Sequence, residues 1–461
     1  MNENIKIKTY NNLENGQIKC PHCGATDIYV NKKNGLLKCN YCRNEFDQEK
    51  LDEVNEDLSK LQGKTIGASA QNIAADAKDI VTIKCQGCGA EVMIDTSETV
   101  QARCHWCRSF LSLNSQVPNG SVPDVVLPFS IKKEDAELKI REFVKKRSFF
   151  AHPKFKKEFN TQNIMGVYFP YMLVDLNAHA TFEGEGEIKT RQYTVGSGDN
   201  KQTYYDADLY EVGRDFDITI DDLSIEANSD RLNLTTNEKT NNIINSIMPF
   251  DTENCVIWNA NYLKGFSSEK RDTNIEQLNN IVNTQAKDIS RIAINETLKK
   301  YDRGVCWKKE NILVKGERWK TAYLPVWLYS YQQKTNKKNI LHYVAVNART
   351  KETMGSVPIN MAKLIFFSLL IELLGVFGMI SLDYEYDWIA LAPGIIFYFI
   401  MFVRYRNSDK RHKYEKDTKR KVFNVKYGDK FIKSKKRLKN RWMIGANNTK
   451  VEGDRTNFLK L

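Results

Sequence analysis

The segment Leu364–Leu382 reads LIFFSLLIELLGVFGMISL, and five residues later Trp388–Val403 reads WIALAPGIIFYFIMFV. A helix rises about 1.5 Å per residue and the hydrocarbon core of a bilayer is about 30 Å thick, so the first segment is long enough to span it and the second nearly is. Tyr384 and Trp388 are typical of an interfacial aromatic belt. The sequence therefore predicts a transmembrane helical hairpin over residues 361–403. The alternative is a buried hairpin inside a globular domain.

The charge distribution predicts an orientation for this hairpin. Residues 404–461 hold 20 Lys and Arg against 6 Asp and Glu, a net charge of +14. The whole chain carries +12, so the residues before 404 sum to −2. Basic flanks stay on the cytoplasmic side, and residues 1–6 lack the apolar core of a secretory signal. We therefore expect a multi-pass protein of the bacterial cell membrane with both termini cytoplasmic, whose basic tail binds anionic membrane lipids.

Two cysteine pairs with repeated spacing are the most specific signal in the chain. Each C-x2-C pair is followed, after fifteen residues, by a second C-x2-C pair. Four thiolates in this arrangement form a tetrahedral structural zinc site, and the reduced state of cytosolic cysteines favours metal over disulfides. A hairpin is expected around Asn34-Gly35 in the first unit. The sequence predicts two zinc ions; the ligands are Cys20, Cys23, Cys39 and Cys42 in one ribbon and Cys85, Cys88, Cys104 and Cys107 in the other. His22 and His105 lie inside the ribbons and are expected to be exposed.

The charge of the ribbon region favours a protein partner over DNA. Residues 1–118 carry 14 basic and 15 acidic side chains, and nonspecific nucleic-acid affinity requires a basic excess. A four-thiolate site is also closed, with no coordination position for a substrate water. Nucleic-acid binding, through the basic tail or the ribbons, remains the second hypothesis.

The middle of the chain contains a short internal sequence repeat, called the echo below. Gly166–Val174 (GVYFPYMLV) matches Thr321–Tyr329 (TAYLPVWLY), and each copy follows a predicted helix, over 131–147 and about 274–301. A strand-rich run is expected from Gly166 to about Ile225, with a hairpin tip near residues 195–200. These features predict two units, each a helix followed by an antiparallel meander, that form one pseudo-duplicated domain.

The ordered set of motifs resembles a known family. The ribbons, the two echo elements and the stretches Met248–Asp251, Tyr262–Phe266 and Val346–Gly355 are similar to the bacterial TFIIB-type zinc-ribbon-containing membrane proteins, some of which carry a primosomal-helicase-like label. No Walker or helicase motif is present to support that label. The resemblance implies a cytosolic partner of the SPFH-domain or phage-shock type and a role in membrane stress.

The chain shows no recognisable catalytic constellation. His152 and His179 are isolated and interpreted as structural, and Cys255 and Cys306 are expected to pack as small apolar groups. The cluster Asp217, Asp221 and Asp222 could bind a hard cation but lacks the spacing of a calcium loop, so a solvated loop is favoured. Glu372 stands alone in its apolar segment, either as a helix–helix contact or proton-sensitive element, or as a protonated side chain tolerated within a hairpin or an oligomer.

These observations predict a non-enzymatic, membrane-anchored scaffold that recruits a cytosolic protein; the oligomeric state stays open. The expected fold class is α+β, with two zinc ribbons, a pseudo-duplicated domain and a transmembrane hairpin. The expected divisions are ribbon 1 (1–47), a helical linker (48–80), ribbon 2 (81–118), the duplicated domain (119–360), the hairpin (361–403) and a basic cytoplasmic tail (404–461).

Overall fold

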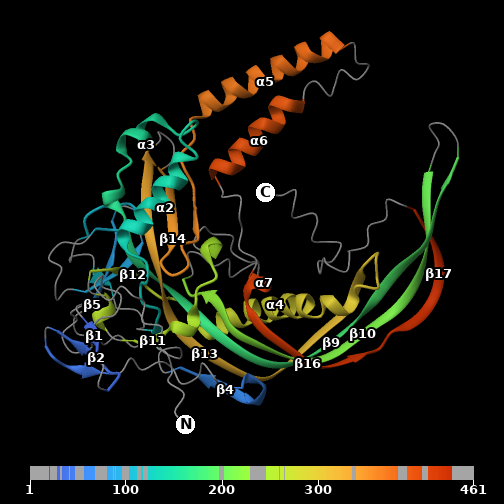
Figure 1. The fold of residues 1–461 in the computed structure, drawn as a ribbon, viewed down its shortest axis with the longest axis horizontal. Coiled ribbons are helices and arrows are strands. Elements are labelled where there is room, and N and C mark those ends of the chain that lie inside the picture. The colour runs from blue at the N-terminus through green and yellow to red at the C-terminus, as the bar shows by residue number, and fades with distance from the viewer. Residues whose placement is uncertain are drawn as a thin grey trace.

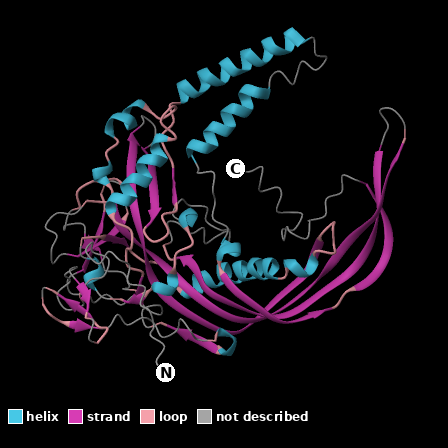
Figure 2. Cartoon of the chain, in the orientation of Figure 1, coloured by secondary structure: helices cyan, strands magenta, loops and turns pink. Residues whose placement is uncertain are grey.

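One large mixed sheet dominates the chain (Figures 1 and 2). This computed structural model describes residues 20–438 except 21–27, 32–33, 41, 47–56, 68–79, 87, 89, 96–102, 112–115, 118–122, 197–201, 229–244, 259, 264, 335–338, 383–391 and 407–413. The described strands form a 3-stranded sheet and a 14-stranded sheet. The predicted α+β fold with a membrane hairpin is wrong, because most of the body is strand that belongs to this single sheet.

Three very long strands form the centre of the large sheet. β9 (Met165–Val195) pairs antiparallel with β10 (Gln202–Glu226) on one side and with β13 (Val305–Lys334) on the other. The strands curve together, and helix α4 (Ile275–Ala293) lies on their concave side, whereas β4 (Gly63–Ile66) lies on the convex side (Figure 1). The curved sheet and α4 thus enclose one of the cores of the molecule.

Helix α4 is held to the sheet by one apolar face. The side chain of Gln277 accepts a hydrogen bond from the backbone N–H of Asn274 at 2.8 Å and so caps the first turn. Apolar residues recur at helical spacing and are buried against alternate residues of β9 and β10, because alternate residues of a strand share one face. The buried helix residues include Ile275, Leu278, Ile281, Val282, Ala286 and Ile289.

The two copies of the internal echo are direct neighbours in the sheet. Pro325 lies opposite Tyr168, and Tyr323 lies opposite Pro170, so the copies pair antiparallel around a local two-fold. The rings of Tyr168 and Tyr323 stack with their centroids 6.1 Å apart. The similar sequences therefore build one continuous surface within the same sheet and not two separate meanders.

Smaller elements cover the end of the sheet at which β9 begins. Helix α2 (Lys133–Lys145) buries Ala136, Ile140, Phe143 and Val144, and α3 (Pro153–Glu158) buries Phe155.

The other strands of the large sheet are β5 (Ile80–Lys84), β6 (Glu91–Asp95), β7 (Gln116–Val117), β8 (Val125–Val126), β11 (Val256–Ile257), β12 (Ser267–Glu269), β14 (Asn339–Asn347), β15 (Thr353–Gly355), β16 (Lys419–Tyr427) and β17 (Lys430–Leu438).

The predicted membrane hairpin corresponds to helices α5 (Met361–Leu382) and α6 (Ala392–Arg406). Within the part of the chain that the structure describes, no helix combines the length and apolarity that a bilayer crossing requires. The fifteen residues of α6 extend over only about 22 Å. The start of α5 is packed on the body, where Leu364 is fully buried. The predictions of a transmembrane hairpin and of a multi-pass membrane location are therefore wrong.

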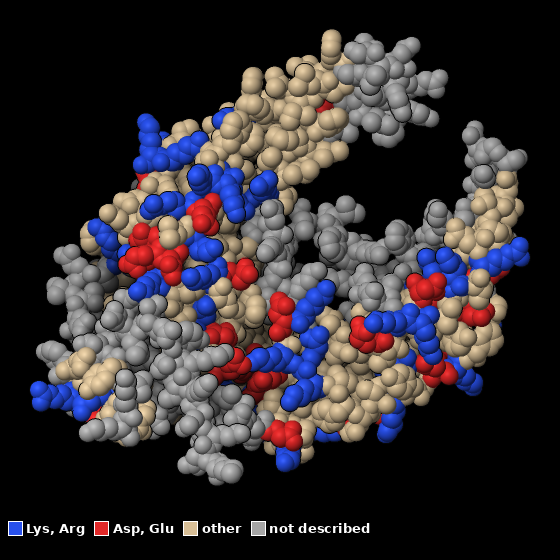
Figure 3. Space-filling view, viewed as in Figure 1, with Lys and Arg blue, Asp and Glu red and all other residues tan. Residues whose placement is uncertain are grey.

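The two helices contact each other closely. Oε2 of Glu372 accepts a hydrogen bond from the backbone N–H of Gly394 at 2.8 Å. A Cβ atom on Gly394 would lie 2.4 Å from the carbonyl oxygen of Ser368, so a larger residue cannot be accommodated there without a shift. In Figure 3 this pair of helices is almost wholly free of charged atoms, whereas acidic and basic side chains alternate along the curved sheet. Glu372 thus makes a helix–helix contact.

Much of the predicted basic tail is an edge of the large sheet. β16 pairs with residues 214–221 of β10, and β17 pairs with residues 204–211, so the two strands continue one another along β10. Their basic side chains meet acids of β10: Nζ of Lys426 lies 3.6 Å from Oδ1 of Asp215. The prediction of a separate cytoplasmic tail is corrected, because composition shows the charge of a segment but not the strand with which it pairs.

Candidate metal centre

The four cysteines of ribbon 2 converge on one point. The Sγ atoms of Cys85, Cys88, Cys104 and Cys107 all lie within 4.8 Å of one another. Sγ of Cys85 is 3.4 Å from that of Cys107, and Sγ of Cys88 is 3.6 Å from that of Cys104. Thiolates around a tetrahedral zinc ion, at about 2.3 Å from the metal, lie about 3.8 Å apart. The cluster therefore has the donor atoms and spacing to hold a metal ion.

Ribbon 1 repeats this arrangement in its described part. Cys20, Cys39 and Cys42 lie within 4.8 Å of one another, with Sγ of Cys20 3.5 Å from Sγ of Cys42. The fourth predicted ligand, Cys23, lies outside the described residues. The expected hairpin is present as β1 (Ile28–Val30) and β2 (Leu37–Cys39), joined in a three-stranded sheet by β3 (Glu45–Phe46).

The same tight turn shapes the second pair of ligands in both ribbons. Arg43 and Arg108, which follow the last cysteine of each unit, have positive φ angles of 62° and 63°. Backbone N–H groups of these residues donate to the carbonyls of Cys39 and Cys104, at 2.9 and 2.8 Å. The repeated Cys-Arg sequence thus corresponds to a repeated turn that directs two sulfur atoms to one side.

Hydrogen bonding prepares ribbon 2 for metal binding. Donation from Cys104 and from the backbone of Ala90 lowers the pKa of Cys88 to about 5, whereas the neighbouring Cys88 raises the pKa of Cys104. Thiolates are the form of cysteine that binds metal, so binding of a metal would release the protons of the ligand thiols.

Ribbon 2 is built into the body and does not extend from it. β6 pairs with β12, which pairs in turn with β9. His105, expected to be exposed, is only 1% exposed, and its carbonyl accepts a hydrogen bond from Oγ of Ser330 at 2.5 Å. The neighbouring Trp106 donates to Glu269 and contacts the Tyr343 ring edge-on, with centroids 5.1 Å apart. The prediction for His105 was wrong because spacing identifies ligands but not the face on which a ribbon docks.

We predict that Trp106→Phe loosens this docking without loss of metal. The ring would still fill its site, but Glu269, which is only 3% exposed, would lose a hydrogen-bond donor. Nε2 of His105 would remain 3.5 Å from the same oxygen, which is too far to replace the lost bond, and a buried acceptor that loses a good donor costs about 1–3 kcal/mol. Urea unfolding of purified protein should show that loss with unchanged zinc content. Leu138→Ala, at a side chain that is 56% exposed, serves as the control. Equal unfolding midpoints for wild type and Trp106→Phe would contradict the docking role.

The predicted acidic cluster is divided between two places on β10. Asp217 lies beside His179, whose Nδ1 is 2.9 Å from its Oδ1, and it accepts from Nζ of Lys315 at 2.6 Å and from Asn424 at 2.9 Å. Asp221 and Asp222 instead approach Asp175 of β9. The sequence missed Asp175, because nothing local marks a residue so distant along the chain as their neighbour.

Asp217 should stabilise the attachment of the edge strand β16. Hydrogen bonds from Asn424 and Lys315 hold the pKa of Asp217 below its usual range. A carboxylate with a lowered pKa contributes stability above pH 4 that is lost as the pH falls through the folded-state pKa. We expect Asp217→Asn to cost about 1–3 kcal/mol at pH 7, with a difference from wild type that shrinks below pH 4. Urea titrations between pH 2.5 and 7 measure this, with the exposed Asp135→Asn as control; a pH-independent difference would contradict it.

Within the described residues, His179, Cys255 and Cys306 have the surroundings of side chains that stabilise the fold. Nε2 of His179 is 3.0 Å from Oδ2 of Asp215. Cys255 is 3% exposed, and burial raises the pKa of its thiol. Cys306 lies in β13 and is partly buried.

Comparison with known proteins finds a distant relative. The uncharacterized protein YdjG of Bacillus subtilis (strain 168) is 26% identical over 246 residues, which cover 52% of this chain and 65% of YdjG. No family model matches the chain, and no solved structure matches it. The relative carries no assigned activity and does not support the resemblance to the TFIIB-type family.

Proposed function

We propose that this protein is a zinc-stabilised, non-enzymatic scaffold that binds a protein partner through ribbon 1. The observation that carries the proposal is the different attachment of two ribbons with the same ligand spacing. Ribbon 2 continues the large sheet through β6 and β12, whereas β1, β2 and β3 form a sheet of their own that pairs with no other described strand. A metal-stabilised module of this kind can present a surface without supporting the body.

The described surface of ribbon 1 has features suited to protein recognition. The ring of Tyr29 is 41% exposed, and tyrosine is enriched among residues that dominate binding energy. Beside it, Glu45 accepts hydrogen bonds from Asn31, Asn34 and Lys38, at 3.0, 2.9 and 2.8 Å. These contacts fix the polar side chains before binding, which lowers the entropic cost of association.

Zinc is the proposed metal in both ribbons. Closed sites with four cysteine ligands are typical of structural zinc, and no position is left open for a substrate water. The family resemblance suggests SPFH-domain and phage-shock-type proteins as the first partners to test.

The test is a binding titration of the zinc-loaded, full-length protein against a purified SPFH-domain protein and a purified phage-shock-type protein. Tyr29→Ala should weaken binding of the true partner about tenfold or more. Leu313→Ala, at a side chain that is 62% exposed on β13, should leave it unchanged. Binding that is equal in both variants, or absent for every candidate, would overturn the role of ribbon 1.

Nucleic-acid binding is the second candidate. β16, β17 and the two residues between them carry nine basic side chains and one acidic one, and the aromatic rings of Tyr427 and Phe431 are 61% and 51% exposed. Such a strand could contact phosphates and stack on bases. This reading requires single-stranded DNA or RNA affinity that falls steeply with salt and is weakened by Lys433→Gln.

A further inference from the structure

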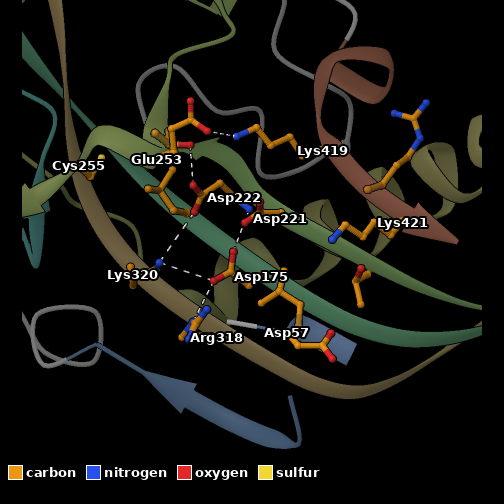
Figure 4. A pocket seen from close by; sticks show the side chains of 15 residues that line it. Asp57, Asp175, Asp221, Asp222, Glu253, Cys255, Arg318, Lys320, Lys419 and Lys421 are labelled. Atoms are coloured by element: carbon orange, nitrogen blue, oxygen red, sulfur yellow. Dashed lines mark hydrogen bonds and ion pairs between the residues drawn. The ribbon is translucent and has the colours of Figure 1, made fainter. Parts of the chain in front are cut away.

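A cavity of about 420 Å³ opens on the large sheet. Its lining comes from β9, β10 and β13, from the loop around Glu253, from the first residues of β16 and from Asp57 and Leu58, which lie between the two ribbons in sequence (Figure 4). Small-molecule sites are commonly of this size and have a few convergent polar groups. Here ten of the fifteen lining residues are charged, five acidic and five basic, and Asp175, Asp221 and Asp222 lie close together.

The acidic part is a cluster of three carboxylates. β10 has an irregularity between Ile220 and Leu223, which allows the consecutive Asp221 and Asp222 to approach Asp175 of β9. One oxygen from each carboxylate lies within 4.8 Å of the others. Oxygen ligands bind Ca²⁺ at about 2.3–2.6 Å, so two ligands of one ion lie no more than about 5.2 Å apart. The spacing thus permits all three to bind one hard cation.

Two polar groups in the cavity have no partner among the described residues. Thr219 is 5% exposed and lines the cavity, yet its hydroxyl makes no hydrogen bond within the described chain. The carboxylate of Asp221 makes no hydrogen bond and no ion pair there either. Thr219 is buried, whereas Asp221 is partly exposed, and buried polar side chains are rarely left unsatisfied. An oxygen-rich ligand, or a cation with its bound water, would satisfy both.

The electrostatics of the cluster also favour a cation. Burial and the neighbouring Asp175 raise the pKa of Asp222 to about 6 and also raise that of Asp221. Nε of Arg318 is 2.9 Å from Oδ2 of Asp175, and Nζ of Lys320 is 3.6 Å from Asp175 and 3.9 Å from Asp222. Asp222 also accepts a hydrogen bond from the hydroxyl of Thr252 at 2.6 Å. A divalent ion would offset the mutual repulsion of the carboxylates.

The basic part of the cavity can receive an anion. Lys419 is paired with Glu253 at 2.5 Å, whereas the exposed Lys421 makes no ion pair within the described residues. In Figure 4 Lys421 extends toward the cavity from the side of β16, opposite Asp175. Hard cations commonly keep waters and are bound by one or two carboxylates together with a phosphate of the ligand.

We propose that this cavity binds a divalent, oxygen-preferring cation through Asp175, Asp221 and Asp222, and that the cation holds a small phosphate-bearing molecule whose phosphate contacts Lys421. The site is independent of the ribbons and of the partner proposed for them. Because β16 supplies one wall, occupancy would also fasten the edge strand to the sheet.

The test uses full-length protein whose cysteine sites are already filled with zinc. Mn²⁺ binding is followed by electron paramagnetic resonance, and pyrophosphate binding by equilibrium dialysis with and without Mn²⁺. One Mn²⁺ should bind per chain, and pyrophosphate should be retained only when the metal is present. Asp221→Asn should weaken Mn²⁺ binding about tenfold or more. Lys421→Gln should leave Mn²⁺ alone unaffected and weaken pyrophosphate binding about fivefold.

Matched controls separate the site from general effects on the fold. Asp208→Asn, on the same strand but outside the cavity, should leave the binding of Mn²⁺ and of pyrophosphate unchanged. Thr219→Val keeps the shape of the side chain and provides a second variant if Asp221→Asn fails to fold. This variant should also weaken Mn²⁺ binding. Undiminished Mn²⁺ binding in both variants, or none in the wild type, would overturn the cation site. Pyrophosphate binding that does not depend on Mn²⁺, or that is unchanged in Lys421→Gln, would overturn the proposal of a phosphate-bearing ligand.

Discussion

Cys104→Ser should abolish metal binding by ribbon 2 and destabilise the end of the large sheet to which the ribbon is attached. The sulfur of Cys104 is fully buried and 3.6 Å from that of Cys88. Structural zinc contributes on the order of 10 kcal/mol to the folding of small modules. Because β6 pairs with β12 and β12 with β9, the loss should reach the body. Zinc content and thermal unfolding measure the two effects.

The expected results are a loss of one zinc equivalent per chain and a much lower unfolding temperature. Cys306→Ser, at a partly buried cysteine outside both clusters, is the matched control and should keep its zinc. A Cys104→Ser protein that retains all its metal would show that ribbon 2 is not the binding site. A protein that loses the metal but melts normally would show that the ribbon does not support the sheet.

Arg214→Met should release the edge formed by β16 and β17. The guanidinium of Arg214 is 1% exposed and donates to both oxygens of Asp429, at 2.5 and 3.3 Å, and to the carbonyl of Thr297 at 3.1 Å. Asp429 lies between the two edge strands, beside the backbone bonds that join Gly213 and Gly428. Asp429 would keep Nζ of Lys300 as a partner at 2.6 Å, so the cost is that of the lost charged hydrogen bonds, about 1–3 kcal/mol.

Hydrogen exchange by mass spectrometry would localise this effect. Amides of residues 419–438 should exchange much faster in Arg214→Met, whereas those of α4 should change less. Lys299→Met is the control, because Lys299 is exposed and its ion pair with Glu296 contributes little. Unchanged protection of 419–438 would mean that strand pairing alone holds the edge.

Features encoded within a short stretch could be predicted from the sequence. The cysteine spacing identified seven described residues that the structure brings together in two clusters. The turn pair Asn34-Gly35 placed the hairpin of ribbon 1, and Gly35 has the positive φ of 76° that this turn requires. The run from Gly166 to Ile225 was recognised as strands, which are now β9 and β10.

Features that depend on distant pairing could not be predicted. The echo showed two similar segments but not that Tyr168 and Pro325 lie opposite each other. The basic C-terminal segment was interpreted through its charge alone, whereas Lys426 approaches Asp215. Composition likewise missed Asp175, which completes the acidic cluster. Hydropathy identified α5 and α6 as apolar helices, but helix length and packing on the body decide whether such helices meet the requirements of a span.

The central claim is that two four-thiolate zinc centres stabilise this protein. Metal analysis combined with zinc X-ray absorption spectroscopy of the purified full-length chain tests it most directly. The account predicts two zinc ions per chain, each surrounded by four sulfur atoms at about 2.3 Å. A chain without zinc, or a first shell dominated by oxygen or nitrogen, would contradict it.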